Sequence, residues 1–148
     1  MATDFTLDLS KFVKRAKGNV EQVVKKVVID VSTAIVERTP VGDPDTWKRP
    51  APAGYVGGRA RGSWMYAAGA PATLDPGTVD GSGRSSLGRV SAGVAGAPAA
   101  SQHFVTSIVP YMRRLEYEGW SQQAPAGMVR ITVQEYQKFV DDACKNLP

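Results

Sequence analysis

Few side chains in this sequence are of the types that catalyse reactions or bind metals, and they are scattered. His103 is the single histidine, so a Ser/His/Asp triad would have to use it, and no acidic residue lies near it in the sequence. Two close carboxylate pairs, Asp43 with Asp45 and Glu116 with Glu118, could serve acid–base chemistry or bind a hard cation. Both pairs flank expected turns, where acidic residues commonly cap and solvate the chain. We therefore interpret these side chains as structural and expect no catalytic residue, no metal site and no cofactor.

A glycine-rich stretch at residues 54–59 invites comparison with a phosphate-binding loop. That motif needs a preceding strand and a following Gly-Lys-Ser or Gly-Lys-Thr, and the sequence has neither. Glycines also permit tight turns, because they adopt backbone conformations that other residues avoid. We interpret this stretch as a set of turns.

Aromatic and basic residues are interspersed over the same part of the chain. The candidates are Trp47, Arg49, Tyr55, Arg59 and Arg61. Such a mixture could stack on nucleic-acid bases and bind phosphates. It could equally form an intersubunit arm, because Trp, Tyr and Arg are prominent in protein interfaces. We favour the arm, with the two aromatic residues as anchors and the three arginines as candidates for subunit or DNA contacts.

Length and composition predict one domain over residues 1–148. The chain has 148 residues, of which 43% are hydrophobic, enough for one core. Its net charge is +4, and the whole excess lies in residues 1–62, with eleven Lys or Arg against seven Asp or Glu. This surplus is smaller and less clustered than in most nucleic-acid-binding domains. The charge permits a weak preference for phosphates or an acidic surface, but it names no partner.

The expected cellular setting is a reducing cytoplasm. The start of the chain lacks the basic cluster and apolar run of a secretory signal, and the longest apolar runs are too short to cross a bilayer. Cys144 is the only cysteine, so it cannot form an internal disulfide. We expect it to be a small buried hydrophobe on the last helix.

The clearest element is a helix over residues 19–38. Valines and one isoleucine recur at spacings of three and four, which places them on one face of a helix: Val20, Val23, Val24, Val27, Val28, Val31 and Ile35. Because β-branched residues are poor helix formers, we expect tertiary or intersubunit packing to hold this helix. Thr39-Pro40 should end it, and Gly18-Asn19 should separate it from a shorter helix upstream.

The middle of the chain favours strands and loops. Seven of the ten prolines and twelve of the fifteen glycines lie in residues 40–100, which argues against long helices there. Three strands are expected, at residues 62–68, 88–94 and 103–109. Residues 40–62 and 72–88 should form extended loops.

Helical spacing returns near the end of the chain. A short helical turn is expected at residues 110–117, with Gly119 as its stop, and a longer helix should begin at Pro125. The predicted fold class is α+β, with a small antiparallel sheet packed by the long N-terminal helix and the C-terminal helix, and with long Pro/Gly-rich loops.

Four motifs, taken in order, carry a likeness to a known family. They are the helix end at residues 38–41, Gly-Arg-Ala-Arg-Gly-Ser-Trp at 58–64, Leu-Glu-Tyr-Glu-Gly at 115–119 and Ala-Pro-Ala-Gly-Met at 124–128. Together they resemble the neck or tail-completion family of long-tailed bacteriophages, whose members are similar to tail terminators in fold. The family usually joins helix and strand by a tight Pro-Val-Asp-Thr-Gly-Arg-Leu step, which residues 42–57 expand here.

The resemblance implies a structural virion protein without catalytic residues. It implies a homo-oligomeric ring, commonly a hexamer, between the head connector or adaptor and the tail tube, with genomic DNA passing through the channel and no membrane partner. The chain would be found in the virion neck, and in the host cytoplasm during assembly. A head-closure or head–tail adaptor protein of the same neck remains an alternative, as does a free nucleic-acid-binding domain.

Overall fold

The computed structural model describes the backbone of residues 2–145 and 147, and the side chains of residues 14, 17–145 and 147. Its elements, in chain order, are α1 (Ala2–Arg38), the 3₁₀ helices η1 (Pro44–Thr46) and η2 (Arg61–Ser63), β1 (Met65–Ala68), α2 (Arg84–Gly96), β2 (His103–Thr106), α3 (Met112–Tyr117), α4 (Val129–Gln134) and α5 (Tyr136–Lys145). The predicted α+β class is confirmed.

The long helix α1 is the axis of the molecule. It runs without interruption for 37 residues, so the predicted break at Gly18-Asn19 is wrong. A single helical glycine costs only about 1 kcal/mol relative to alanine, which is too little to end a helix by itself. The predicted end of the helix is confirmed, because α1 stops at Arg38, directly before Thr39-Pro40.

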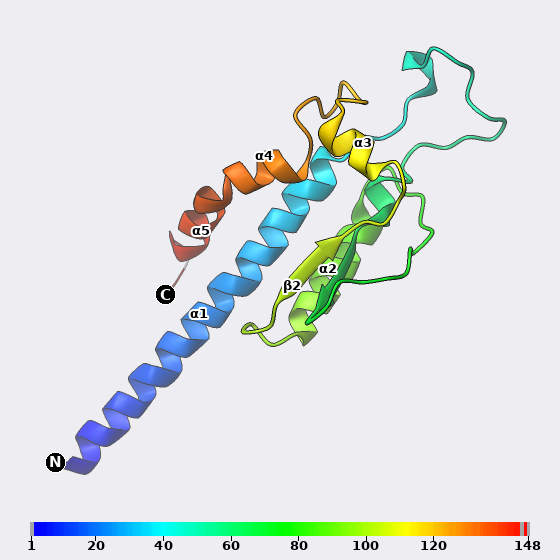
Figure 1. Cartoon of the computed structure of the whole chain (residues 1–148). Coiled ribbons are helices and arrows are strands. Elements are labelled where there is room, and N and C mark those ends of the chain that lie inside the picture. The colour runs from blue at the N-terminus through cyan, green and yellow to red at the C-terminus, as the bar shows by residue number, and fades with distance from the viewer. Residues whose placement is uncertain (1, 146, 148) are drawn as a thin grey trace.

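Two groups of elements flank α1 on different sides, as Figure 1 shows. One group is the pair α4 and α5, which run back along α1. The other is α2 with the sheet, in which β1 and β2 pair antiparallel from Met65 opposite Thr106 to Ala68 opposite His103. The helix α2 connects the two strands and packs on both β1 and α1. The two-stranded sheet is therefore linked to α1 mainly through α2.

The predicted strand at residues 88–94 is wrong, because these residues belong to α2. The glycines of this segment were taken as helix breakers, but at least one of them is needed for packing. A Cβ at Gly93 would lie 2.2 Å from a ring carbon of Tyr66, so the glycine lets the helix approach the sheet. Asp80 supports the start of α2 by accepting hydrogen bonds from the backbone N–H and the hydroxyl of Ser85 at 2.9 and 2.8 Å. The loop predicted over residues 72–88 therefore ends where α2 begins.

Three further elements, and the exposure of one side chain, differ from the sequence-based expectations. The strands predicted at residues 62–68 and 103–109 are shortened to β1 and β2. The single helix predicted from Pro125 is two helices, α4 and α5, separated at Glu135. Cys144 is exposed and not buried as predicted.

The hydrophobic core lies at the C-terminal end of α1. Its buried members include Ile35 and Val36 from α1, Trp64 from the turn before β1, Leu115 from α3 and Met128 before α4. The end of α1, the turn before β1, α3 and the segment before α4 therefore share one core. Among the described residues, no helix combines the length and apolar composition that crossing a bilayer requires.

Candidate interface arm and its supports

Residues 43–56, here called the arm, extend from the body between α1 and η2 (Figure 1). All of its side chains except Ala51 are exposed. Asp43 begins the arm by capping η1, since its carboxylate accepts a hydrogen bond from the N–H of Asp45 at 3.1 Å. Gly54 makes the return turn with a φ of 75°, which a residue with a side chain adopts only at a cost. The arm is thus a loop with defined turns near both of its ends, at Asp43 and at Gly54.

Trp47 and Tyr55 face each other across the arm. Their ring centroids are 4.8 Å apart with an interplanar angle of 60°, an edge-to-face arrangement. A Cβ added at Gly42 would lie 2.0 Å from the hydroxyl oxygen of Tyr55, so the tyrosine rests directly on the glycine backbone. Trp47 is 41% exposed and Tyr55 36% exposed. The pair therefore stiffens the arm while leaving much aromatic surface for a partner.

The base of the arm is closed by backbone contact and by a side-chain clamp. A Cβ at Gly57 would lie 2.3 Å from the carbonyl oxygen of Gly42, so the two limbs of the chain touch there. Gln123, in the loop between α3 and α4, donates to the carbonyl of Val41 at 2.8 Å and accepts from its N–H at 3.0 Å. These contacts fix where the arm leaves the body.

The three candidate arginines lie in different surroundings. Arg49 is exposed on the arm. Arg59 forms a two-pronged ion pair with Asp75, and hydrogen bonding from this guanidinium, with the N–H of Gly77, holds the pKa of the Asp75 carboxyl below its usual value. Arg61 donates to the carbonyls of Thr39, Gly81 and Glu37 at 2.9, 3.0 and 3.0 Å. The structure therefore gives Arg59 and Arg61 partners within the chain, and their roles in subunit or DNA contacts stay predictions.

The motif residues at 38–41 and 58–64 meet at the end of α1. The indole N–H of Trp64 donates to the hydroxyl of Thr39 at 2.8 Å, and that hydroxyl donates to the carbonyl of Ile35 at 2.7 Å. Trp64 is 4% exposed and belongs to the core. Arg38 binds the hydroxyl of Thr132 at 2.9 Å and the carboxylate of Glu135 at 2.6 Å. These two motifs fasten the end of the helix to the rest of the fold.

The remaining two motifs meet at the buried carboxylate of Glu116. It accepts hydrogen bonds from the N–H groups of Met128, Val129 and Arg130 at 2.8, 2.9 and 2.9 Å, at the start of α4. Burial opposes ionisation, but these hydrogen bonds outweigh it and hold the pKa of Glu116 below its usual value. Gly127 makes the approach possible, since a Cβ there would lie 2.6 Å from Glu116 atoms.

A cluster of arginine and aromatic side chains beside α3 was not predicted from the sequence. The guanidinium of Arg114 lies 4.6 Å from the ring centroid of Trp120, and that of Arg130 lies 4.8 Å from the centroid of Tyr117. Both rings are more than half exposed, at 57% and 60%. Stacking of this kind depends on tertiary placement, so residue types alone gave no signal for it.

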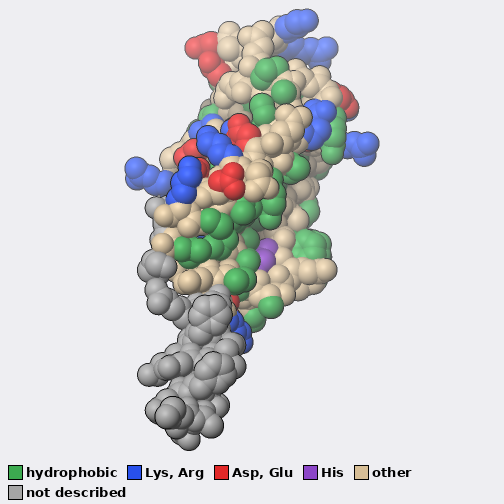
Figure 2. Space-filling model, turned by 90° about the vertical axis from the view of Figure 1, so that its left-hand side faces the viewer, with side chains coloured by type: hydrophobic (Ala, Val, Ile, Leu, Met, Phe, Trp, Pro, Cys, Tyr) green, Lys and Arg blue, Asp and Glu red, His purple; other side chains and the backbone are tan. Residues whose placement is uncertain are grey.

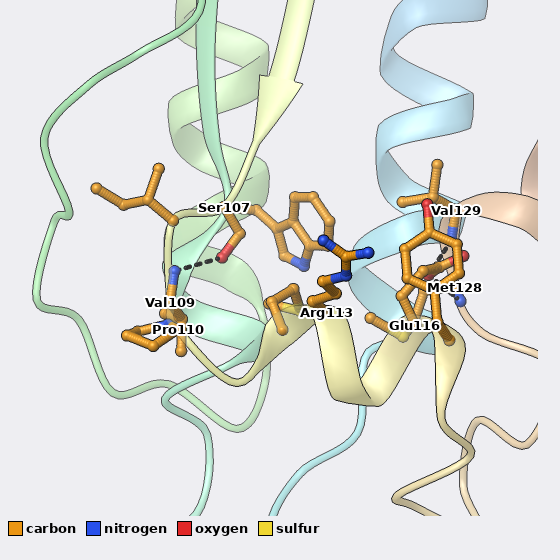
Figure 3. A pocket seen from close by; sticks show the side chains of 11 residues that line it. Ser107, Val109, Pro110, Arg113, Glu116, Met128 and Val129 are labelled. Carbon is orange, nitrogen blue, oxygen red and sulfur yellow. Dashed lines mark hydrogen bonds between the residues drawn. The ribbon is translucent and has the colours of Figure 1, made fainter.

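A shallow pocket of about 290 Å³ lies between residues 107–110, which follow β2, and α3 and the start of α4 (Figure 3). Its lining is mainly apolar, with Trp64, Val109 and Met128 among the residues, and the guanidinium of Arg113 lies across it. The carboxylate of Glu116 at its edge is already bound to backbone N–H groups. The pocket is therefore a shallow hollow between packed elements. Its lining contains no nucleophilic side chain with a base beside it.

The residues that first suggested chemistry have structural partners. The Nδ1 atom of His103 lies 2.6 Å from the hydroxyl of Tyr66, across the sheet, and its Nε2 lies 3.1 Å from the carbonyl of Ala99. The carboxylates of Asp43 and Glu116 cap helices, as expected for acidic residues at turns. Among the described residues, no three His, Cys, Asp or Glu side chains gather where they could hold a metal ion.

Comparison with known proteins found no matching family model, no similar curated protein and no similar solved structure.

Proposed function

We propose that this chain is a structural protein of the phage neck, present as several copies in a ring that completes the tail and joins it to the head connector. The arm is the observation that carries the proposal. It is held at its base, stiffened by the pair of Trp47 and Tyr55, and exposed along nearly its whole length. An ordered loop of this kind is suited to contact a neighbouring subunit, because little further ordering is needed on docking.

The four motifs that resemble the neck family support the proposal in a second way. Their residues build the joint between α1, α3 and α4, so they maintain the body from which the arm extends. A ring subunit needs a rigid body, because the direction in which the arm leaves it sets the rotation from one copy to the next. No catalytic step is required of the chain.

The proposal is tested by replacing both anchors in a phage that encodes this chain. Trp47→Ala with Tyr55→Ala should leave the circular dichroism spectrum and the unfolding midpoint near those of the wild type, because the two rings pack on each other and on the backbone of Gly42, and neither belongs to the hydrophobic core. The mutant phage should yield tailless heads or unattached tails under the electron microscope.

The matched control is Trp120→Ala, which removes an exposed aromatic side chain outside the arm and outside the four motifs. That variant should give complete particles. Normal infectious particles from the arm variant, or equal loss of particles from both variants, would count against the arm as the assembly contact.

A further inference from the structure

The valine face of α1 is only partly covered within this chain. A groove of about 490 Å³ runs along it between β2 and α5. Hydrophobic side chains gather around His103 on the corresponding face of the molecule in Figure 2. The lining residues include Val24 and Val28 from α1, Val105 from β2, and Tyr136 and Val140 from α5. The groove is thus a hollow lined mainly by half-buried apolar side chains, with Tyr136 exposed at its side, and such a surface is suited to an apolar segment.

The first part of α1 extends away from the body (Figure 1), and the residues of α1 that line the groove begin only at Val23. The described side chains from Lys17 to Gln22 are exposed apart from that of Asn19, and Val20 is 62% exposed. Residues 2–16 continue the same helix, for about 22 Å at 1.5 Å per residue. In the sequence of this segment, apolar residues recur at positions 5, 9, 12 and 16, with the same spacing of three and four as the valines.

We propose that the groove binds residues 2–16 of a second copy of this chain. The inference rests on the proposed ring and names the contact between its subunits. A continuous helix cannot turn back onto its own side, so the segment cannot fill the groove of the same molecule. The groove follows α1 from Val23 to Ser32, about 15 Å, which a helical segment of this length can cover.

The contact joins two different surfaces, the start of α1 in one copy and the groove in the next. Such a head-to-tail contact repeats from copy to copy and closes into a ring when the rotation permits. The mode is that of an amphipathic helix laid into an apolar groove, with anchors at three- and four-residue spacings. The arm and this contact would then hold neighbouring subunits at two separate places.

Cys144 allows the contact to be tested in the full-length chain. It is the only cysteine, it is exposed, and it lies one helical turn beyond Val140 on α5, at the end of the groove. A short maleimide–succinimide reagent should link Cys144 to lysines 11, 14 or 17 of another copy. Mixing isotopically light and heavy chains identifies intermolecular links, because these contain one peptide of each mass. Cys144→Ser should abolish them.

A groove variant supplies the second measurement. Val28→Asp places a charge in the groove and should abolish both the cross-link and the oligomer seen by light scattering, whereas Val133→Asp, at an exposed position outside the groove, should preserve them. Tyr136→Ala, at a position 54% exposed, should reduce the cross-link at least threefold and covers the case that Val28→Asp does not fold.

The outcomes separate this contact from the proposed function. The inference is overturned if the wild-type chain gives no intermolecular link between Cys144 and residues 2–17, or if the Val28→Asp chain gives that link equally. If such a chain is still found as a ring in the phage neck, the proposed function stands and another surface joins the subunits. If it is absent from the neck although the link forms, the helix contact stands and the proposed function fails.

Discussion

The indole N–H of Trp64 donates a hydrogen bond to the hydroxyl of Thr39, directly after the last residue of α1, at 2.8 Å. Both side chains are buried, with Thr39 at 0% exposure and Trp64 at 4%. The contact joins residues 25 positions apart in the sequence and connects the long helix to the segment that leads into the sheet. Substitution of Thr39 therefore tests how much this connection between α1 and the segment before β1 contributes to stability.

Thr39→Val keeps the shape of the side chain but removes the acceptor, leaving a buried indole N–H without a partner. We expect the free energy of unfolding to fall by about 1–3 kcal/mol. Thr33→Val is the control, because the Thr33 hydroxyl bonds only to the carbonyl of Ile29 in its own helix, and it should change stability by less than about 0.5 kcal/mol. Urea unfolding measures both, and equal stabilities of the two variants would contradict this role of Thr39.

Two glycines of α2 should respond to alanine in opposite directions. A Cβ at Gly93 meets the ring of Tyr66 at 2.2 Å, whereas a Cβ at Gly88 meets nothing within 4 Å. Gly93→Ala should therefore lower the free energy of unfolding by about 1–3 kcal/mol through overpacking. Gly88→Ala should raise it by about 0.5–1 kcal/mol, since alanine is the better helix former. Thermal unfolding of the two variants decides, and stabilisation by Gly93→Ala would show that α2 does not lie against the sheet in this way.

Glu116 should make stability depend on pH in the acid range. Its pKa is lowered in the folded chain, so the ionised side chain stabilises the fold above its unfolded pKa, near 4.5, and this contribution is lost as pH falls through the folded pKa. Glu116→Gln should cost about 2 kcal/mol at neutral pH. The difference in unfolding free energy between this variant and the wild type should shrink as the pH is lowered from neutrality to below 4.5.

Glu118→Gln is the control for the carboxylate, because Glu118 is exposed two residues further along. It should leave the free energy of unfolding at neutral pH nearly unchanged. A constant difference between Glu116→Gln and the wild type across the whole pH range would show that the charge of Glu116 contributes nothing to the cap of α4.

DNA binding by the isolated chain should be weak. The guanidinium of Arg59 is paired with Asp75, and that of Arg61 is bound to three backbone carbonyls, so phosphate binding would have to compete with these contacts. Filter binding at two salt concentrations measures the affinity. Tight binding that falls steeply with salt would favour a nucleic-acid-binding domain over a ring subunit.

Sequence patterns predicted the elements whose signals are local. The valine spacing indicated α1 and the proline fixed its end, because both depend on neighbours within one or two turns. The α2 helix was missed because the glycine at position 93 serves a contact with Tyr66, from another element. The predicted break at Gly18 was wrong because a single glycine was taken to end a helix. The helical segments on both sides of it outweigh its low helix propensity.

The sequence singled out the residues of the arm as interface candidates, and that role stays a prediction; their contacts within the chain were not predicted. Trp47 and Tyr55 were expected to be interface anchors, and the structure places them together at the surface of the arm. Nothing in the residue types distinguished exposed Arg49 from Arg61, whose partners are backbone carbonyls. The stack of Arg114 on Trp120 was missed because its geometry is set by the turn after α3.

Cryo-electron microscopy of purified particles from a phage that encodes this chain tests the central claim most directly. We predict a ring of copies of the chain between head and tail, with each arm against the neighbouring subunit and the DNA channel through the middle. Complete, infectious particles whose necks do not contain the chain, or contain it as an isolated single copy, would contradict the account.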